Sequence, residues 1–257
     1  MAESEYPVRY VAFLDILAFR ELITNLNKDE TKLSSVRDLL RNIHNPDPEL
    51  FKNILPKSDF RAQSISDAVA ISAKMTPDGL AHMFMAIERL AQKLLKAGYL
   101  LRDAIAKGKV FHDHEMVFGE GVVRAYHYES KIALYPRIML LREIVDDVNQ
   151  CLKEDRLKNI FDGMVRRSKD GPQYLNVLRY YARIKEMKGD DPKRELMLAT
   201  ITDIRNHIQR RLDEAVDEPE HFKKVHWFAD YWNEIFYGVA GLKRIEGPGL
   251  EILLTAG

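Results

Sequence analysis

The sequence has little of several features that identify common classes of protein. Its 257 residues include a single cysteine, Cys151, which excludes a disulfide framework and a zinc site built of cysteines. Lysine plus arginine equals aspartate plus glutamate, 39 of each, so the chain lacks the basic excess of a typical nucleic-acid binder. It also has no apolar run long enough to cross a bilayer and no apolar signal core near its start. We therefore expect a soluble cytoplasmic protein with no membrane segment and no nucleic-acid partner.

The apolar residues that are present, 46% of the chain, are enough for a sizeable core, and their pattern along the chain predicts an α+β fold. Residues 8–17 form a dense β-branched and aromatic run typical of a buried strand, and residues 59–74 alternate as a hairpin with a break at Ser66-Asp67. Further segments follow in the order helix (76–98), strand pair (99–111 and 115–119), helix (120–133) and strand (from 135). This order is a βαββαβ plan with one extra hairpin, a ferredoxin-like architecture.

The character of the chain changes near residue 142. Charged residues and helical periodicity dominate from there, and an aromatic-rich segment lies at 222–236. We predict one domain at 1–141 and a mainly helical extension at 142–257 that packs on it or at a dimer interface. The aromatic segment is most simply a packing core, although a dimer surface or a lid over a ligand is an alternative.

Two acids interrupt strands that otherwise have a buried composition. Asp15 lies inside the first strand, and Asp67 lies at the turn of the hairpin that neighbours this strand in a ferredoxin-like sheet. Two unpaired carboxylates that converge there would repel each other unless a cation lay between them. Hard oxygen ligands suit Mg²⁺ or Mn²⁺, and such ions commonly bind substrate phosphates. The alternative is that each aspartate caps a turn or pairs with a nearby arginine.

Four motifs in order resemble the catalytic domain of the class III adenylate and guanylate cyclases. FLDILAF at 13–19 is similar to the first metal motif of that family, and SISDA at 64–68 is similar to the second. LRDAIAKG at 101–108 resembles a strand motif, and FGEGVVRAYHYES at 118–130 resembles the segment that ends in an E-S pair. The resemblance covers about residues 8–141.

The resemblance implies two Mg²⁺ or Mn²⁺ ions in each active site. Asp15 and Asp67 would hold them, with the Ile16 carbonyl as an extra ligand. The main-chain amides of Leu17, Ala18 and Phe19 would bind phosphate oxygens at the start of the following helix. The reaction would be attack of the ribose 3′-hydroxyl on the α-phosphate, with release of pyrophosphate.

The sequence departs from the family at the residues that stabilise the transition state. The asparagine of the family falls on Val123 and its arginine falls on His127. Charge stabilisation at the α-phosphate would then need another cation. Arg102, Arg124 and Arg137 are the candidates, and we take Arg102 as the catalytic one.

The residues that select the base also depart from those of the purine cyclases. The two positions carry Gln63 and Met116, which form neither the adenine pair nor the guanine pair. Because a glutamine amide can both donate and accept, Gln63 could recognise the edge of uracil or cytosine.

A narrower resemblance links the chain to the bacterial pyrimidine cyclases of the Pycsar antiphage systems. It rests on the same motifs together with YPRI at 135–138 and WFADYWN at 227–233. It implies conversion of UTP or CTP into cyclic UMP or cyclic CMP, a homodimer, and a separate effector activated by the cyclic nucleotide. A catalytically inactive nucleotide-binding module, a purine cyclase and a helical interaction protein remain as alternatives.

The tripeptide HDH at 112–114 is the other polar cluster that we single out. His112 and His114 alternate as zinc ligands on a strand would, but they fall between two paired strands. We therefore expect a solvent-exposed hairpin turn.

Overall fold

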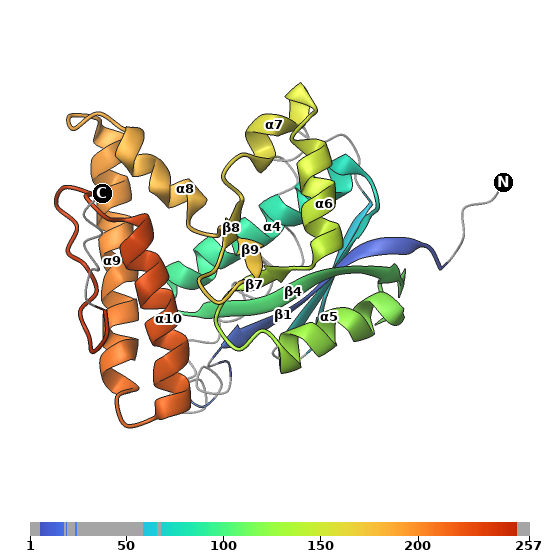
Figure 1. Ribbon diagram of the computed structural model, residues 1–257, viewed down its shortest axis with the longest axis horizontal. Coiled ribbons are helices and arrows are strands. Elements are labelled where there is room, and N and C mark those ends of the chain that lie inside the picture. The colour runs from blue at the N-terminus through green and yellow to red at the C-terminus, as the bar shows by residue number, and fades with distance from the viewer. Residues whose placement is uncertain (1–5, 18, 20–23, 25–58, 66–67, 251–257) are drawn as a thin grey trace. The chain divides into compact units, whose positions relative to one another are not determined.

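The computed structural model describes residues 6–17, 19, 24, 59–65 and 68–250 (Figure 1). The described part is α+β, as predicted, and divides into two compact units. The first extends to Val177, apart from residues 95–98, and the second comprises those four residues and the chain from Leu178 onward. The strands are β1 (Val8–Leu17), β2 (Phe60–Ile65), β3 (Ala68–Lys74), β4 (Leu100–Lys109), β5 (Phe111–His112), β6 (Val117–Phe118), β7 (Ile138–Leu140), β8 (Val165–Arg167) and β9 (Gln173–Leu175). The helices of eight residues or more are α4 (Pro77–Lys96), α5 (Glu120–Lys131), α6 (Arg142–Cys151), α9 (Pro192–Glu214) and α10 (Pro219–Ile235).

Seven strands form one mixed sheet in the order β2-β3-β1-β4-β7-β9-β8. β1 is antiparallel to both of its neighbours, β3 and β4, whereas β4 and β7 are parallel. The predicted strand at 8–17 is β1, and the predicted hairpin at 59–74 contains β2 and β3. The predicted strand at 99–111 is divided into β4 and β5, and β5 pairs with β6 in a separate two-stranded sheet. β7 lies in the segment predicted as a strand from residue 135. The first hairpin therefore lies beside β1, as the predicted plan requires.

The two faces of β1 contact different helices, because successive side chains of a strand point to opposite sides. On one face, the Tyr10 hydroxyl donates to the Asp147 carboxylate of α6 at 2.6 Å. On the other face, Val11 packs against Gly121 of α5, and the Phe13 ring meets the Tyr126 ring of α5 edge-on. We call this second side the α5 face. Asp15 belongs to it by the same alternation.

Helix α4 begins and ends as the sequence predicts. The Thr76 hydroxyl accepts a hydrogen bond from the Gly79 amide at 3.0 Å, and Pro77 occupies the first turn. Gly98 follows the helix with φ +81°, a conformation that favours glycine. The predicted apolar stripe is fully buried and comprises Leu80, Phe84, Ile87, Ala91 and Leu94.

The sheet continues beyond residue 141, where the sequence placed a boundary. β8 and β9 add two short strands next to β7, and the first unit ends only at Val177. Arg137 fixes the connection between β8 and β9. Its side chain is 3% exposed and donates to both carboxylate oxygens of Asp170 at 2.6 Å. These contacts lower the pKa of Asp170 to about 2, chiefly through the hydrogen bonds from Arg137.

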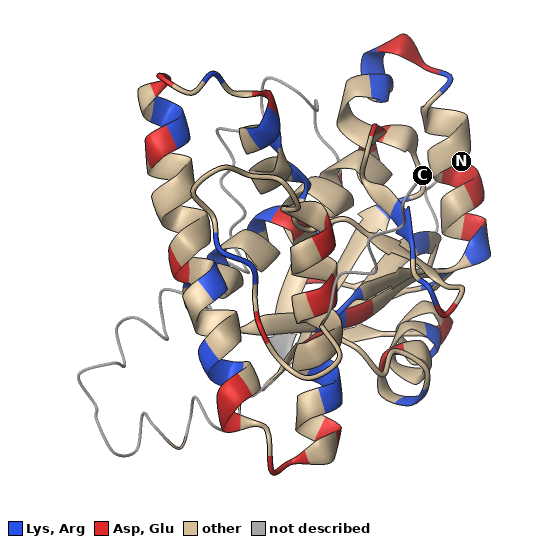
Figure 2. Ribbon diagram, turned by 60° about the vertical axis from the view of Figure 1, so that its left-hand side comes forward, with Lys and Arg blue, Asp and Glu red and all other residues tan. Residues whose placement is uncertain are grey.

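The second unit is mainly helical. Its core is formed by one face each of α9 and α10, including the aromatic residues Phe228, Tyr231 and Trp232, so these three are packing residues. The Asn233 amide binds both the amide and the carbonyl of Ile245, which holds the following chain on α10. Lysine and arginine alternate with aspartate and glutamate along the helices (Figure 2). Among the described residues, no helix has the length and apolar character needed to cross a membrane.

Candidate functional site

Asp15 lies in a cluster of charged residues on the α5 face. In the sheet register it is opposite Ala68 of β3 on one side and Arg102 of β4 on the other. Arg102 Nη2 lies 2.7 Å from Asp15 Oδ2 and 2.5 Å from Oε1 of Glu129, which projects from α5. The side chains of Asp15 and Arg102 are about one fifth exposed (21% and 18%), whereas that of Glu129 is only 5% exposed. A ligand can therefore reach Asp15, whereas Glu129 is buried and contacts Arg102 from α5.

Asp103 adds a third carboxyl group next to this ion pair. It is fully buried, and its Oδ1 accepts hydrogen bonds from the Phe13 amide at 2.9 Å and from the amide of the next residue, Ala104. Burial holds the pKa of Asp103 well above its usual value, and the nearby charges of Glu129 and Asp15 raise it further. Burial therefore favours the neutral, protonated form of Asp103. We call Asp15, Arg102, Asp103 and Glu129 the acid cluster.

The second predicted metal ligand, Asp67, lies outside the described residues. Its neighbour in the chain, Ala68, is the residue paired with Asp15. Within the described part of the chain, no three histidine, cysteine or acidic residues are arranged to hold a metal ion. The donor chemistry nevertheless suits a hard divalent cation, because Asp15 offers carboxylate oxygens at an accessible position.

The other predicted metal and phosphate ligands follow Asp15 along the chain. Ile16 is buried and pairs with Leu101, and Leu17 is the last residue of β1. Phe19 is helical, which agrees with a helix starting shortly after the strand. Ala18 lies outside the described residues, so the phosphate-binding role of this segment stays a prediction.

The three candidate arginines have different surroundings. Arg137 is committed to Asp170 and Ser168. Arg124 donates to the Lys107 carbonyl and to the carboxylate of Glu143 on α6. Among the described residues, the Arg102 guanidinium is the one of the three that is paired with Asp15 and Glu129, and it is the one that we selected.

The two departures from the cyclase motif lie on the surface of α5. Val123 is 66% exposed and His127 is also exposed. Neither side chain contributes to the acid cluster.

The two predicted base-selecting positions are brought close together. Gln63 of β2 donates through Nε2 to the Glu115 carbonyl at 2.9 Å, and Met116 is the next residue. The Gln63 Oε1 atom is buried without a hydrogen-bond partner among the described residues, and the Met116 side chain is 48% exposed. An unpaired but covered acceptor thus lies beside an accessible apolar side chain.

The prediction of an exposed turn at 112–114 is wrong for its first residue. His112 is 2% exposed, and its Nδ1 lies 2.8 Å from the Ser72 hydroxyl, because the hairpin of β5 and β6 folds onto the α5 face. Asp113 and His114 form the turn itself, where the Asp113 carboxylate accepts the amides of Glu115 and Met116. β5 ends at His112, so the turn that follows carries His114 out of the strand and leaves it in solvent, whereas His112 points inward.

Two members of the acid cluster were missed in the sequence. Glu129 lies in the E-S pair of the fourth motif, and Asp103 directly follows Arg102 in the third. Helical spacing offered a signal for Glu129, because Gly121, Ala125 and Glu129 are four residues apart and form the buried stripe of α5.

The described side chains can together hold a cation at Asp15, present a guanidinium next to it, and offer an amide acceptor at Gln63. Comparison with known proteins adds no constraint to this chemistry: no protein-family model and no curated protein matches the chain.

Proposed function

We propose that the protein is a class III nucleotidyl cyclase that converts UTP or CTP into the 3′,5′-cyclic nucleotide and pyrophosphate. The observation that carries the proposal is the acid cluster, which lies where Asp15 of β1 is paired with Ala68 of β3 and with Arg102 of β4. Asp15 is accessible there, and the residue opposite it in β3 directly follows Asp67 in the sequence. The antiparallel order β2-β3-β1-β4 supports a ferredoxin-like core for this domain.

The role of Asp15 follows from its charge and accessibility. With Asp67 and the Ile16 carbonyl it would hold two Mg²⁺ or Mn²⁺ ions, which supply activation of the 3′-hydroxyl and neutralisation of the phosphates. Asp103 contributes no charge while it is protonated, and its hydrogen bond to the Phe13 amide fixes the backbone two residues before Asp15. This bond keeps the Asp15 carboxylate in place on the α5 face.

Arg102 would stabilise the charge that develops on the α-phosphate. Its guanidinium has five N–H donors in a planar fork that matches phosphate oxygens. The buried Glu129 carboxylate holds the guanidinium next to Asp15 and keeps it from moving into solvent. This arrangement supplies the cation that the family otherwise takes from α5, where His127 stands here.

Gln63 would select a pyrimidine base. Its Oε1 has no hydrogen-bond partner among the described residues, and this carbonyl oxygen can accept a hydrogen bond from N3–H of uracil or from the amino group of cytosine. The Nε2 bond to Glu115 fixes which way the amide points. Met116 offers an apolar contact for the ring.

The biological role that we propose rests on the Pycsar resemblance. The cyclic pyrimidine nucleotide would serve as a second messenger in antiphage defence and would activate a separate effector. Because cyclases of this class form their active site between two catalytic domains, we propose a symmetric homodimer with two equivalent sites.

Product analysis tests the proposal directly. The purified protein is incubated separately with UTP, CTP, ATP and GTP in the presence of Mn²⁺, and the products are resolved by chromatography. We expect a cyclic pyrimidine nucleotide and pyrophosphate, with loss of both in Asp15→Asn and Asp67→Ala. Asp146→Asn, which removes an exposed carboxylate of α6, is the matched control and should retain activity. A cyclic purine as the main product would refute the assignment of Gln63, and activity in Asp67→Ala would refute the metal site.

A catalytically inactive nucleotide-binding module is the second candidate. It is favoured by one observation: Val123 and His127 stand exposed at the positions where the family has its transition-state asparagine and arginine. This candidate predicts metal-dependent triphosphate binding by calorimetry, without release of pyrophosphate from any of the four nucleotides.

A further inference from the structure

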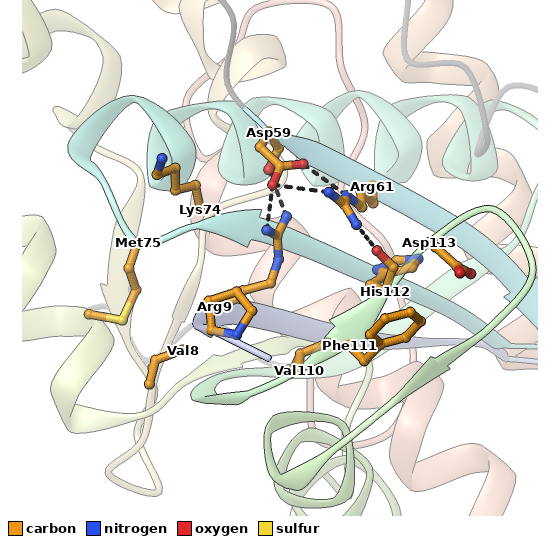
Figure 3. A pocket seen from close by; sticks show the side chains of 11 residues that line it. Val8, Arg9, Asp59, Arg61, Lys74, Met75, Val110, Phe111, His112 and Asp113 are labelled. Atoms are coloured by element: carbon orange, nitrogen blue, oxygen red, sulfur yellow. Dashed lines mark hydrogen bonds and ion pairs between the residues drawn. The ribbon is translucent and has the colours of Figure 1, made fainter. Parts of the chain in front are cut away.

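A cavity of about 400 Å³ lies on the α5 face at the opposite end of β1 from Asp15. Arg9 lines it, and the six residue steps from Arg9 to Asp15 correspond to about 20 Å of extended strand. Its lining contains cationic side chains on one side and apolar side chains on the other (Figure 3). The proposed cyclase site makes no use of this cavity.

Two arginines share one carboxylate at the polar wall. Arg9 donates to the Asp59 carboxylate at 2.6 Å and to the Asp59 carbonyl at 2.8 Å, and Arg61 donates to the same carboxylate at 2.9 Å. Partial burial opposes ionisation of Asp59, but the hydrogen bonds from both arginines outweigh it and lower its pKa. Dashed lines in Figure 3 show this arrangement. Asp59 is therefore a fixed anion that holds the two guanidinium groups side by side.

His112 completes the polar wall as a neutral ring. Its pKa is lowered to about 4, first by burial and then by the charges of Arg9 and Arg61. The Ser72 hydroxyl accepts from Arg9 Nε at 3.0 Å, which leaves its own hydrogen free to be donated to His112 Nδ1. The ring proton is then on Nε2, which is buried and has no partner among the described residues.

The charges of the lining leave an excess of positive charge. Arg9, Arg61 and Lys74 contribute three positive charges, and Asp59 and Asp113 contribute two negative ones. Asp113 is directed to the amides of its own turn, where both hydrogen bonds are 2.8 Å. Within the described part of the chain, the hydrogen bonds of Arg61 to Asp59 and to the His112 carbonyl use three of its five N–H groups, which leaves two donors for a ligand.

The opposite wall is apolar. It is formed by Pro7, Val8, Met75, Val110 and Phe111. Val8 and Met75 are 45% and 43% exposed, and the Phe111 ring stacks on the Phe118 ring at 5.2 Å. An aromatic platform next to a pair of guanidinium groups suits a flat apolar body that carries an anionic group.

We propose that this cavity is a second ligand site, for a small organic anion with a phosphate or carboxylate group on a flat apolar body. The anionic oxygens bind to Arg61 and Arg9, and the apolar body lies against Phe111 and Met75. Binding needs no divalent metal, so the site is distinct from the proposed nucleotide site in chemistry as well as in place.

Calorimetric titration in EDTA tests this site apart from the proposed cyclase activity. The probes are phenyl phosphate, benzoate, inorganic phosphate and the uncharged benzyl alcohol. We expect one phenyl phosphate site per chain, weaker binding of inorganic phosphate, and no binding of benzyl alcohol. Benzoate shows whether a carboxylate serves as well as a phosphate. Arg61→Gln and Phe111→Ala should each weaken binding by about tenfold, the effect of losing one hydrogen bond to a charged group or one apolar contact.

Two control variants show whether binding depends on this cavity in particular. Arg156→Gln removes the same charge from another arginine that pairs with an aspartate, Asp78, and should leave binding unchanged. Asp15→Asn should also leave it unchanged, whether or not the protein proves to be a cyclase. The proposal is overturned if phenyl phosphate does not bind in EDTA. Equal weakening by Arg156→Gln and Arg61→Gln, or full binding in both Arg61→Gln and Phe111→Ala, overturns it as well.

Discussion

Arg102 sets the charge balance of the acid cluster. The guanidinium lies between the carboxyl groups of Asp15 and Glu129, and burial of the third carboxyl group raises the pKa of Asp103 and so favours its neutral form. Acidic residues outnumber the one arginine of the cluster even before Asp67 is counted. The proposed divalent cation at Asp15 would offset this excess of acidic residues.

Replacement of Arg102 by alanine should cost the protein about 3 kcal/mol of unfolding free energy, because it leaves the buried Glu129 charge without its guanidinium. Urea unfolding at neutral pH measures this loss. The double variant Arg102→Ala, Glu129→Gln should recover part of it, since the buried charge is then absent. Arg124→Ala is the matched control: its ion pair with Glu143 is more than one third exposed on the Arg124 side and should contribute no more than about 1 kcal/mol. Equal losses in the two single variants would refute the role given to Glu129.

His112 should make stability depend on pH. Its pKa in the folded protein is about 4, below the 6.5 of the unfolded chain, so the unfolded state binds the proton more readily. The contribution of neutral His112 is complete above pH 6.5 and is lost as the pH falls towards 4. At pH 5 the loss should reach about 2 kcal/mol relative to pH 7.5.

Urea unfolding of His112→Asn at the two pH values measures this contribution. The variant should lose about 2 kcal/mol less than the wild type on acidification. The exposed His114→Asn serves as control and should follow the wild type. His82, whose pKa is also lowered to about 4 by burial, keeps part of the pH dependence in all three proteins. A wild-type pH dependence in His112→Asn would mean that the buried ring does not titrate in this range.

At the scale of elements, two glycines determine how closely α5 approaches the sheet. A Cβ atom on Gly108 of β4 would lie 2.5 Å from both the amide nitrogen and the Cα atom of Gly121, and both of these are backbone atoms that cannot rotate away. Gly108→Ala should therefore displace α5, cost about 2 kcal/mol of unfolding free energy and reduce the proposed cyclase activity through Glu129. Gly189→Ala, where a Cβ atom meets nothing within 4 Å, should change neither quantity. Unchanged stability in Gly108→Ala would refute the close contact.

The elements that could be predicted from the sequence are those with a strong local pattern. β1 and α4 have dense apolar runs or a full helical stripe, and α4 also has recognisable caps at Thr76 and Gly98. β8 and β9 were missed because each has only three residues, which is too short for a periodicity to appear. They form by pairing with β7, a contact distant in sequence.

Some residues of the candidate site could likewise be predicted from the sequence, and others could not. Asp15 stands out because an acid inside a buried strand is costly without a partner. Glu129 does not, since an acid in a charged helix usually faces solvent, and only the packing of α5 on the sheet buries it. The inward turn of His112 depends likewise on where the hairpin of β5 and β6 folds.

At the scale of the whole molecule, the change in composition near residue 142 is not the end of the first compact unit. α6 is rich in charge, yet its inner face packs on the sheet through Ile144, Val145 and Val148. Cys151 belongs to the same face, and burial raises the pKa of its thiol to about 11. Composition alone therefore marked where the surface becomes more polar, whereas the unit continues as far as its core does, to Val177.

The proposed homodimer predicts complementation between two inactive proteins. If each active site takes its metal ligands from one copy and its base-selecting residues from the other, Asp15→Asn and Gln63→Trp damage opposite halves of a site. Unfolding and refolding the two variants together at equal concentration gives heterodimers as half of all dimers, and each heterodimer has one intact site out of two. The mixture should therefore regain about a quarter of the proposed cyclase activity of the wild type, as two-fold symmetry requires. Asp15→Asn mixed with Asp67→Ala is the matched control and should regain none, because both changes damage the metal half. The first mixture could stay as inactive as the second although both variants form dimers. The complete site would then lie within one copy, and residues 15 and 63 of that same copy would serve one nucleotide.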